Sequence, residues 1–458
     1  MRKRVAIVGG GIAGLAAALR VRDRAPASTE IIVYEQSGVL GGKLRTGRLA
    51  GLTVERGAES FLMSAPDGDE SAAVRLARRL GLGDELVHPA AVPAAVAGER
   101  GLEPFPPGTL MGIPATTGPA DTDAGAPLLG AGADVAVGEL VRARAGDDVL
   151  ERLVDPLLGG VYAGRADALS LAATLPGLAA AARDEHTLAG AVRAALARSA
   201  AVRVAGRPTF GAVRGGMSRL IAVAASAARA RISLGLPVRE LAPTPHGWRL
   251  LLGPVPAPQT DDVDAVILAV PARPAARLLA EVDVPASAAV GKLDYASVAL
   301  AAFALPPGTE LPDLSGFLVP PRAGTLVKAA TFVSRKWPHV PQGDAPVVVR
   351  VSLGRAGEEE GLQRDDRTLT AIAHEELSAL LGVPLPAPVE TWVQRWGGGL
   401  PQYSPGHLDR VAAARAALAD AARPGLALAG AAYDGVGIPA CVASGETAAD
   451  NVCKTLEE

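Results

Sequence analysis

Cysteine is scarce in this sequence: its 458 residues include only Cys441 and Cys453. Two cysteines exclude a disulfide framework and a thiolate-rich metal centre, and they favour a reducing compartment, so we predict a cytoplasmic protein. We expect two small buried side chains rather than a redox-active disulfide. The six histidines are scattered and form no HExxH or HxxxH pair, so we predict no metal site.

Aromatic residues are also few, and the chain has neither a large net charge nor an apolar run suited to crossing a bilayer. Aromatic residues make up 3% of the chain although hydrophobic residues make up 49%, so Ala, Val and Leu carry most of the core. The net charge of −3 gives no basic surface for nucleic acid. The long uncharged run at residues 104–120 is interrupted by prolines and cannot span a bilayer, so we expect at most peripheral membrane contact.

Residues 5–35 show the pattern of a dinucleotide-binding βαβ unit: an apolar strand, a GxGxxG turn, a helix and a second strand. We expect Gly9 to make the tight turn, Gly11 to let the backbone approach a pyrophosphate, and Gly14 to allow close packing of helix on strand. Glu35 ends the second strand, where it would accept hydrogen bonds from ribose hydroxyls, which disfavours NADP.

A second glycine pair, Gly41-Gly42, follows this unit and precedes Lys43 and Arg45. Flavoproteins of the amine oxidase type place such a segment over the pyrophosphate, whereas simple NAD dehydrogenases lack it, so the pair favours FAD. The fork-shaped guanidinium of Arg45 suits a phosphate; the alternative is a solvent-exposed arginine.

Residues 426–439 read as a strand, a glycine turn and the start of a helix. Backbone N–H groups at Val436, Gly437 and Ile438 would lie at the positive end of that helix. They could stabilise the negative charge that collects at the N1/O2 edge of a reduced flavin, unless the segment is an ordinary surface turn.

The remaining pattern predicts an α/β protein with a discontinuous Rossmann-like FAD-binding domain, a mixed-sheet substrate domain and a helical insertion. Helices are predicted at 69–80, 147–158, 179–200 and 368–381, strands at 232–241, 248–252, 263–270, 297–305, 316–319, 328–332, 347–353 and 426–429, and a loop at 104–133. The expected domains are FAD-binding 1–80, 207–272 and 424–458, helical 81–206, and substrate-binding 273–423.

The chain resembles the oxygen-dependent protoporphyrinogen/coproporphyrinogen oxidases of the amine-oxidase superfamily of flavoproteins. The motifs that carry the resemblance are VGGGIAG at 8–14, GGKLRT at 41–46, VERGAESF at 54–61, PGTLMGIP at 107–114, GVYAG at 160–164, LSL at 169–171, TFG at 209–211, RGGM at 214–217, SRKWPH at 334–339, LPQY at 400–403 and AYDGVGIP at 432–439. They run nearly from end to end, and their style is that of the actinobacterial branch, which is similar to enzymes acting on coproporphyrinogen III.

The resemblance implies a non-covalent FAD and a six-electron oxidation of coproporphyrinogen III to coproporphyrin III in heme biosynthesis. Hydride would pass to flavin N5, O2 would be reduced to hydrogen peroxide, and no protein side chain would act as the catalyst. It implies transient handover of product to a ferrochelatase. The residues it places at FAD are Gly9, Gly10, Gly11, Ile12, Ala13, Gly14, Glu35, Gln36, Gly42, Lys43, Arg45, Gly57, Ala58, Glu59, Ser60, Val238, Trp396, Gly430, Val436, Gly437 and Ile438.

The residues that would bind substrate are less well marked. Segments that look like the substrate domain offer four basic residues for its carboxylates: Arg207, Lys328, Arg335 and Lys336. Glu59 would either orient substrate or pair with Arg56. The chain departs from some relatives in two ways: residues 62–66 carry no basic residue, and 115–133 is a low-complexity loop where a helix often continues. The helical insertion also lacks a Trp/Phe/Leu face for membrane anchoring.

Other functions stay open. Within the family, protoporphyrinogen IX is the alternative substrate. An amine oxidase or desaturase-like flavoprotein is a second alternative, although 4 Trp, 5 Tyr and 6 Phe leave little material for the aromatic cage of an amine oxidase. A non-catalytic, flavin-bound tetrapyrrole carrier is the third, and it would release no peroxide on turnover.

Overall fold

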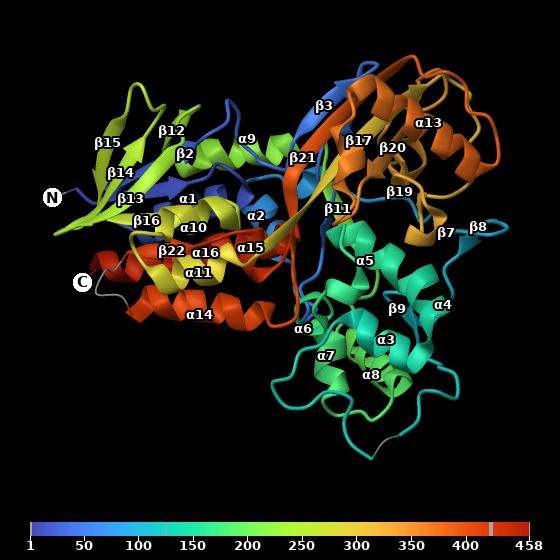
Figure 1. Cartoon of the computed structure of the whole chain (residues 1–458). Helices are drawn as coiled ribbons and strands as arrows, with labels where there is room; N and C mark the ends of the chain where they lie inside the picture. Colours follow the sequence, from blue (N-terminus) through green and yellow to red (C-terminus); the bar gives the residue numbers. More distant parts are fainter. Residues whose placement is uncertain (1, 124, 421–424, 458) are drawn as a thin grey trace.

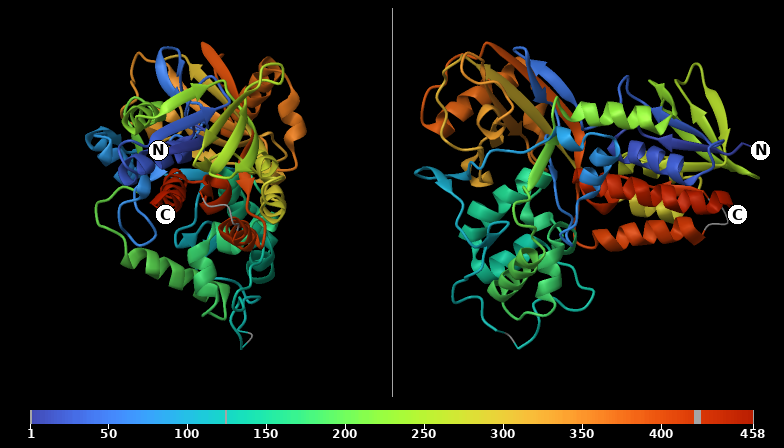
Figure 2. Two further views of the ribbon diagram at one scale, coloured as in Figure 1. Left: turned by 90° about the vertical axis from the view of Figure 1, so that its left-hand side faces the viewer. Right: turned by 180° about the vertical axis from the view of Figure 1, so that it is seen from behind.

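The computed structural model describes residues 2–123, 125–420 and 425–457. Figure 1 shows three bodies: a parallel sheet between helices, a larger sheet covered by a long helix, and a helical body below the larger sheet. The chain begins and ends in the first body (Figure 2). This arrangement confirms the predicted α/β class with a mixed sheet and a helical part.

The first body is built on a five-stranded parallel sheet with the order β12-β2-β1-β16-β22. Its strands are β1 (Arg4–Val8), β2 (Glu30–Glu35), β12 (Arg231–Leu234), β16 (Ala265–Leu268) and β22 (Leu426–Leu428). Side chains of β1 alternate between two cores, with Val5 and Ile7 on one face and Ala6 and Val8 on the other. Both faces are therefore buried, as in parallel sheets generally.

Helices cover both faces of this sheet. One face packs against α1 (Ile12–Arg24), α2 (Ala72–Arg79), α9 (Met217–Ala228) and α16 (Ile438–Glu457). The other face packs against α10 (Ala272–Leu279), α11 (Val284–Gly291), α14 (His407–Asp420), the short α15 (Ala431–Asp434), and the antiparallel strands β13 (Val238–Thr244), β14 (Gly247–Leu252) and β15 (Gln259–Val263).

The second body is a seven-stranded mixed sheet with the order β21-β17-β20-β19-β18-β7-β8. Its strands are β7 (Ala94–Gly98), β8 (Gly101–Pro104), β17 (Asp294–Leu305), β18 (Gly316–Leu318), β19 (Val327–Phe332), β20 (Val347–Leu353) and β21 (Glu390–Gln402), and α12 (Val333–Lys336) follows β19. The helix α13 (Asp366–Leu381) covers one face. The other face meets the first body, because Ala302, Val348 and Trp392 share the core of α1 and α16.

The helical body has its own core and is joined to both sheets by short strands. It contains α3 (Val137–Ala145), α4 (Asp147–Val149), a π-helical turn (Leu150–Val154), α5 (Asp155–Tyr162), α6 (Leu171–Thr174), α7 (Pro176–Ala182), α8 (Leu188–Ala201), β9 (Thr109–Leu110) and β10 (Ile113–Pro114). The remaining strands are the hairpin β3 (Thr46–Leu49) and β4 (Leu52–Glu55), and β5 (Phe61–Leu62), β6 (Leu86–Val87) and β11 (Phe210–Val213). Short 3-10 turns lie at Gly83–Glu85, Ala166–Ala168, Pro321–Ala323 and Glu359–Gln363.

The predicted elements are present, and several are divided. The helix expected at 147–158 is split by the π-helical turn, next to Pro156, which has no backbone N–H for a regular helix. The helix expected at 179–200 is two helices, and Thr187 caps the second by accepting a hydrogen bond from Gly190 N. The strands expected at 232–241 and 263–270 are also pairs of strands.

Two of the expected domains contain elements that pack on another body. Within 81–206, which was expected to be helical, β7 pairs with β18 and places β7 and β8 in the seven-stranded sheet. Within 273–423, which was expected to form the substrate domain, α10, α11 and α14 pack on the five-stranded sheet. The boundary expected at 423–424 lies outside the described residues. None of the described helices has both the length and the apolar content to cross a bilayer.

Candidate functional site

The first glycine turn has the steric demands that the motif predicts. Gly9 has a φ of 112°, and a Cβ there would lie 2.4 Å from Ala269 O. A Cβ on Gly14 would lie 2.0 Å from Gly9 O, so α1 packs closely on the strand. At Gly11 the situation is opposite, because no described atom lies within 4 Å of a Cβ built there. The turn therefore has two glycines required by packing and one that faces open space.

The second glycine pair lies against this open position. Gly11 and Gly41 form a parallel bridge, and Gly41 N donates to Gly10 O at 2.9 Å. A Cβ on Gly42 would lie 3.6 Å from the Cα of Gly11. The helix α1 begins after Gly11 without a side-chain cap, so its first N–H groups are available to an anion. The two turns thus form one cradle that a phosphate group would fill.

Glu35 is fixed at the end of β2 by two backbone donors. Its carboxylate accepts hydrogen bonds from Gly10 N and Ser37 N, both at 2.8 Å. The segment that leads into β13 lies beside it, since Leu236 N donates to Glu35 O at 3.0 Å. The structure therefore brings Glu35, the exposed Gln36 and Val238 to one edge of the sheet.

A third group of predicted FAD residues meets around Trp396. Arg56 N donates to Arg45 O at 2.7 Å, and Trp396 Nε1 donates to Arg56 O at 2.8 Å. The Arg45 guanidinium lies 5.7 Å from the centre of the Trp396 ring, so Arg45 is not a free surface arginine. A Cβ on Gly57 would lie 1.9 Å from Lys43 O. The segments 43–45 and 57–60 therefore run side by side, and burial lowers the pKa of Lys43.

Glu59 is held in a largely buried ion triad. Its carboxylate pairs with Lys336 Nζ and with Arg350 Nη2, the latter at 2.6 Å. Arg350 Nη1 also donates to Glu55 O (2.9 Å) and Gly57 O (3.1 Å). The side chains of Glu59 and Arg350 are each 11% exposed. One guanidinium therefore holds three points of the segment that runs beside Lys43 and Arg45.

The prediction that Glu59 pairs with Arg56 is wrong. The Arg56 guanidinium lies over the ring of Trp392, 5.0 Å from its centre, whereas Glu59 pairs with Lys336 of α12 and Arg350 of β20. Burial alone would raise the pKa of Glu59, but Arg350 and Lys336 outweigh it and lower the pKa to about 2. Arg350 was not among the predicted site residues; the signal that marks it is a single charge inside the mostly apolar strand β20.

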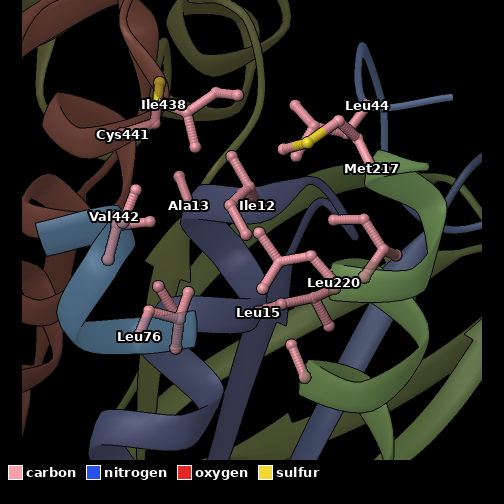
Figure 3. Close-up of a cluster of buried hydrophobic side chains, with 14 of the residues drawn as sticks. Ile12, Ala13, Leu15, Leu44, Leu76, Met217, Leu220, Ile438, Cys441 and Val442 are labelled. Carbon is pink, nitrogen blue, oxygen red and sulfur yellow. The ribbon is translucent and has the colours of Figure 1, made fainter. Parts of the chain in front are cut away.

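The C-terminal turn lies against the N-terminus of α1. Gly430 has a φ of 120°, and a Cβ there would lie 3.9 Å from the Cβ of Ala13. Figure 3 shows Ile438 and Cys441 of α16 beside Ile12 and Ala13 of α1. The backbone of residues 436–438 is therefore close to the cradle formed by the two glycine turns, so the segment is not an isolated surface turn.

Both cysteines are free and buried, as the sequence analysis expected. Burial raises the pKa of the Cys441 thiol to about 11, although Lys43 acts in the opposite direction. The thiol is therefore protonated at neutral pH, so it is a weak nucleophile there. Among the described residues no cluster of His, Cys, Asp and Glu could hold a metal ion.

A cavity of about 260 Å³ lies behind the segment 55–59. Glu55, Glu59 and Arg350 line it together with apolar residues such as Trp337 and Val340. Burial raises the pKa of Glu55 to about 7, although its carboxylate accepts hydrogen bonds from Met217 N and Thr46 Oγ1. Glu55, Glu59 and Arg350 are therefore all bonded within the protein.

The four basic residues expected to bind substrate do not share a site. Each is engaged by the protein in a different place: Arg207 with Gly68 O (2.6 Å), Lys328 with Gly159 O (3.0 Å), Arg335 with Leu311 O (3.4 Å), and Lys336 with Glu59. Lys328 differs from the others because it is deeply buried, only 5% exposed, and lines a small cavity.

The sequence and the fold of this chain are both similar to those of known flavoproteins. Residues 12–453 match the family described as flavin containing amine oxidoreductase. The coproporphyrinogen III oxidases of Mycobacterium tuberculosis (strain H37Rv) and Mycobacterium leprae are 36% and 37% identical to the chain; the alignments cover 98% and 96% of it and 97% and 95% of those proteins. The crystal structure of a putative protoporphyrinogen oxidase from Exiguobacterium is similar over the whole of both chains, with 30% identity and a TM-score of 0.84.

Proposed function

The chain belongs to the flavin-containing amine oxidoreductase family, and from this premise we propose that it is an FAD-dependent oxidase that converts coproporphyrinogen III to coproporphyrin III with O2 as acceptor. Family membership implies a flavin. The observation that carries the choice of substrate is 36–37% identity, over nearly the whole length, to proteins named coproporphyrinogen III oxidase. The proposed place is heme biosynthesis in the cytoplasm, with at most peripheral membrane contact.

The residues present fit FAD. The cradle of Gly11, Gly41 and the uncapped start of α1 suits a pyrophosphate, and the Glu35 carboxylate suits ribose hydroxyls. Bound FAD supplies a two-electron acceptor that O2 regenerates with release of hydrogen peroxide, and three rounds account for six electrons. The N–H groups at 436–438 would orient the ring and stabilise its negative edge. The segment 57–60, held by Arg350, would fix its position.

The first test concerns the form of the cofactor. We expect purified protein to be yellow and acid precipitation to release free FAD, because the buried, protonated Cys441 is a poor partner for a covalent bond. The measurement is flavin in the supernatant against flavin in the pellet. Flavin that stays with the precipitated protein, or recovery of NAD alone, would contradict the proposal.

The second test concerns the substrate. We expect a higher kcat/KM for coproporphyrinogen III than for protoporphyrinogen IX, measured by porphyrin fluorescence under one set of conditions, with peroxide formed at each turnover. Protoporphyrinogen IX is the second candidate substrate, because the similar Exiguobacterium protein is named a putative protoporphyrinogen oxidase. Equal or better use of protoporphyrinogen IX would overturn the specificity and leave the oxidase. If neither were oxidised, the proposed function would fail; porphyrin binding without peroxide would indicate a carrier.

The product would pass to a ferrochelatase through a transient encounter. Coproporphyrin III carries four carboxylates, and a site that takes all of them out of water would need several buried cations. Of the four basic residues that the sequence offers, Lys328 is the one that is buried.

A further inference from the structure

Two cations are buried together between α5 and the seven-stranded sheet. Lys328 of β19 is 5% exposed and Arg355, which follows β20, is 4% exposed. Within the described residues, their hydrogen bonds all end on carbonyl oxygens: Lys328 Nζ on Gly159 O (3.0 Å), and Arg355 on Thr325 O (2.8 Å) and Val319 O (3.1 Å). A buried ammonium has three donors and a guanidinium five, so both retain bonding capacity.

The acidic groups near this pair are engaged elsewhere or exposed. The half-buried Glu376, whose charge also acts on Arg355, accepts from Leu326 N (3.0 Å) and Val327 N (2.8 Å). Asp155 is 4% exposed and lines the same cavity, but its carboxylate accepts from Ala166 N at 2.6 Å and pairs with Arg165 at 3.2 Å. Glu358 is 3.8 Å from Arg355, and its side chain is 51% exposed. Burial, with the charge of Arg355, lowers the pKa of Lys328 to about 7. The cluster thus holds more buried positive charge than buried negative charge, which costs stability unless an anion joins it.

A cavity of about 10 Å³ lies between these groups, which is space for about one water molecule. Asp155, Gly159, Gly164, Lys328 and Arg355 are among its walls. It therefore opens onto both cations. Figure 1 shows α5 at the junction of the helical body and the seven-stranded sheet, beside β19.

The helix that closes this cavity is irregular. It is preceded by the π-helical turn Leu150–Val154, contains Pro156 and two glycines, and ends at Ala163 with a φ of 55°. π-helical turns and left-handed non-glycine residues concentrate at functional sites, and glycine weakens a helix. The wall over Lys328 is therefore an interrupted helix and not a regular one.

We propose that Lys328 and Arg355 form the binding site for a substrate carboxylate that coproporphyrinogen III has and protoporphyrinogen IX lacks, admitted when α5 shifts. This inference rests on the proposed function. An incoming carboxylate would satisfy the spare donors of both cations, with Arg355 able to bind it through two N–H groups. A vinyl group in its place would leave both cations without an anion, which is how a polar site rejects an apolar analogue.

The test is the variant Lys328→Met in the FAD-loaded enzyme. We expect its Kd for coproporphyrin III to rise about 30-fold, as for loss of one partner of a buried charge pair, and its Kd for protoporphyrin IX to change little. The measurement is porphyrin fluorescence titration. The matched control is Lys292→Met, which removes an exposed lysine at the end of α11 and is expected to leave both Kd values unchanged.

Thermal unfolding separates a binding role from a structural one. Lys328→Met removes a buried cation that forms no ion pair among the described residues, so its Tm is expected to equal or exceed that of the parent protein. A lower Tm would mark a structural lysine and overturn the inference. So would unchanged affinity for coproporphyrin III, or equal loss for both porphyrins. If the parent protein neither oxidises coproporphyrinogen III nor binds coproporphyrin III, the proposed function fails instead.

Discussion

Gly11→Val is expected to give a folded protein that retains no flavin. Gly11 has a φ of −75° and a ψ of 179°, which any residue adopts, and no described atom lies within 4 Å of a Cβ built there. The fold can therefore accept a valine. Its methyl groups would fill the cradle between the start of α1 and Gly41, where the pyrophosphate is proposed to lie. The measurement is flavin absorbance relative to protein absorbance after purification, together with Tm.

Two other glycines provide the controls. Gly14→Val is expected to unfold the first body, because its Cβ would lie 2.0 Å from Gly9 O. Gly177→Val lies in the exposed first turn of α7, with no described atom within 4 Å of its Cβ, and is expected to keep flavin. If Gly11→Val kept the flavin content of the parent protein, the cofactor would have to bind elsewhere.

The parts of the fold that depend on local pattern could be predicted from the sequence. An apolar strand followed by a glycine turn specifies its own geometry, and the steric demands at Gly9 and Gly14 agree with the motif. Elements divided by a proline or a cap were predicted as one, since the apolar pattern continues across the break. Residues 179–200 show this: the run of alanines hides the end of α7 and the cap at Thr187.

Long-range pairing explains what the sequence did not reveal. Glu59 and Arg350 are separated by 291 positions, and nothing near Glu59 in the chain indicates its partner, whereas Arg56 is close and basic. The strand β7 joins a sheet through parallel pairing with β18, which lies far along the chain. For Arg207 and Arg335, the sequence shows a positive charge and cannot show that it ends on a backbone carbonyl.

Arg350→Met is expected to have the largest effect on stability of any single change in the ion triad. It leaves Glu59 buried with Lys336 as its remaining cation, and it releases Glu55 O and Gly57 O. Removing one partner of a buried ion pair costs about 3 kcal/mol. FAD affinity is expected to fall as well, because Gly57 lies beside Lys43. Denaturant unfolding and flavin titration measure the two effects separately.

The control for the triad is a surface pair with similar chemistry. Arg249 pairs with Asp262 through two hydrogen bonds, and both side chains are more than half exposed. Arg249→Met is expected to change stability far less than Arg350→Met, because water screens an exposed ion pair, and to leave flavin affinity unchanged. Arg350→Lys keeps the charge without the fork of donors, so its effect is expected to lie between those of Arg350→Met and the parent protein.

Glu59→Gln removes the carboxyl that makes the stability of the triad depend on pH, and the sign of that dependence follows from the lowered pKa of Glu59. The pKa of Glu59 is lowered in the folded protein to about 2, so its charge stabilises the fold above the ordinary glutamate pKa of 4.5, and that contribution is lost as pH falls towards 2. The difference in unfolding free energy between the parent protein and Glu59→Gln is therefore expected to be largest at pH 7 and to disappear on acidification.

Combined with Arg350→Met, Glu59→Gln is expected to cost less than the sum of the two single changes, because they break the same contact. Unfolding free energies of the four proteins at neutral and acid pH measure both effects; a gap independent of pH, with additive costs, would show that the triad does not act as a unit.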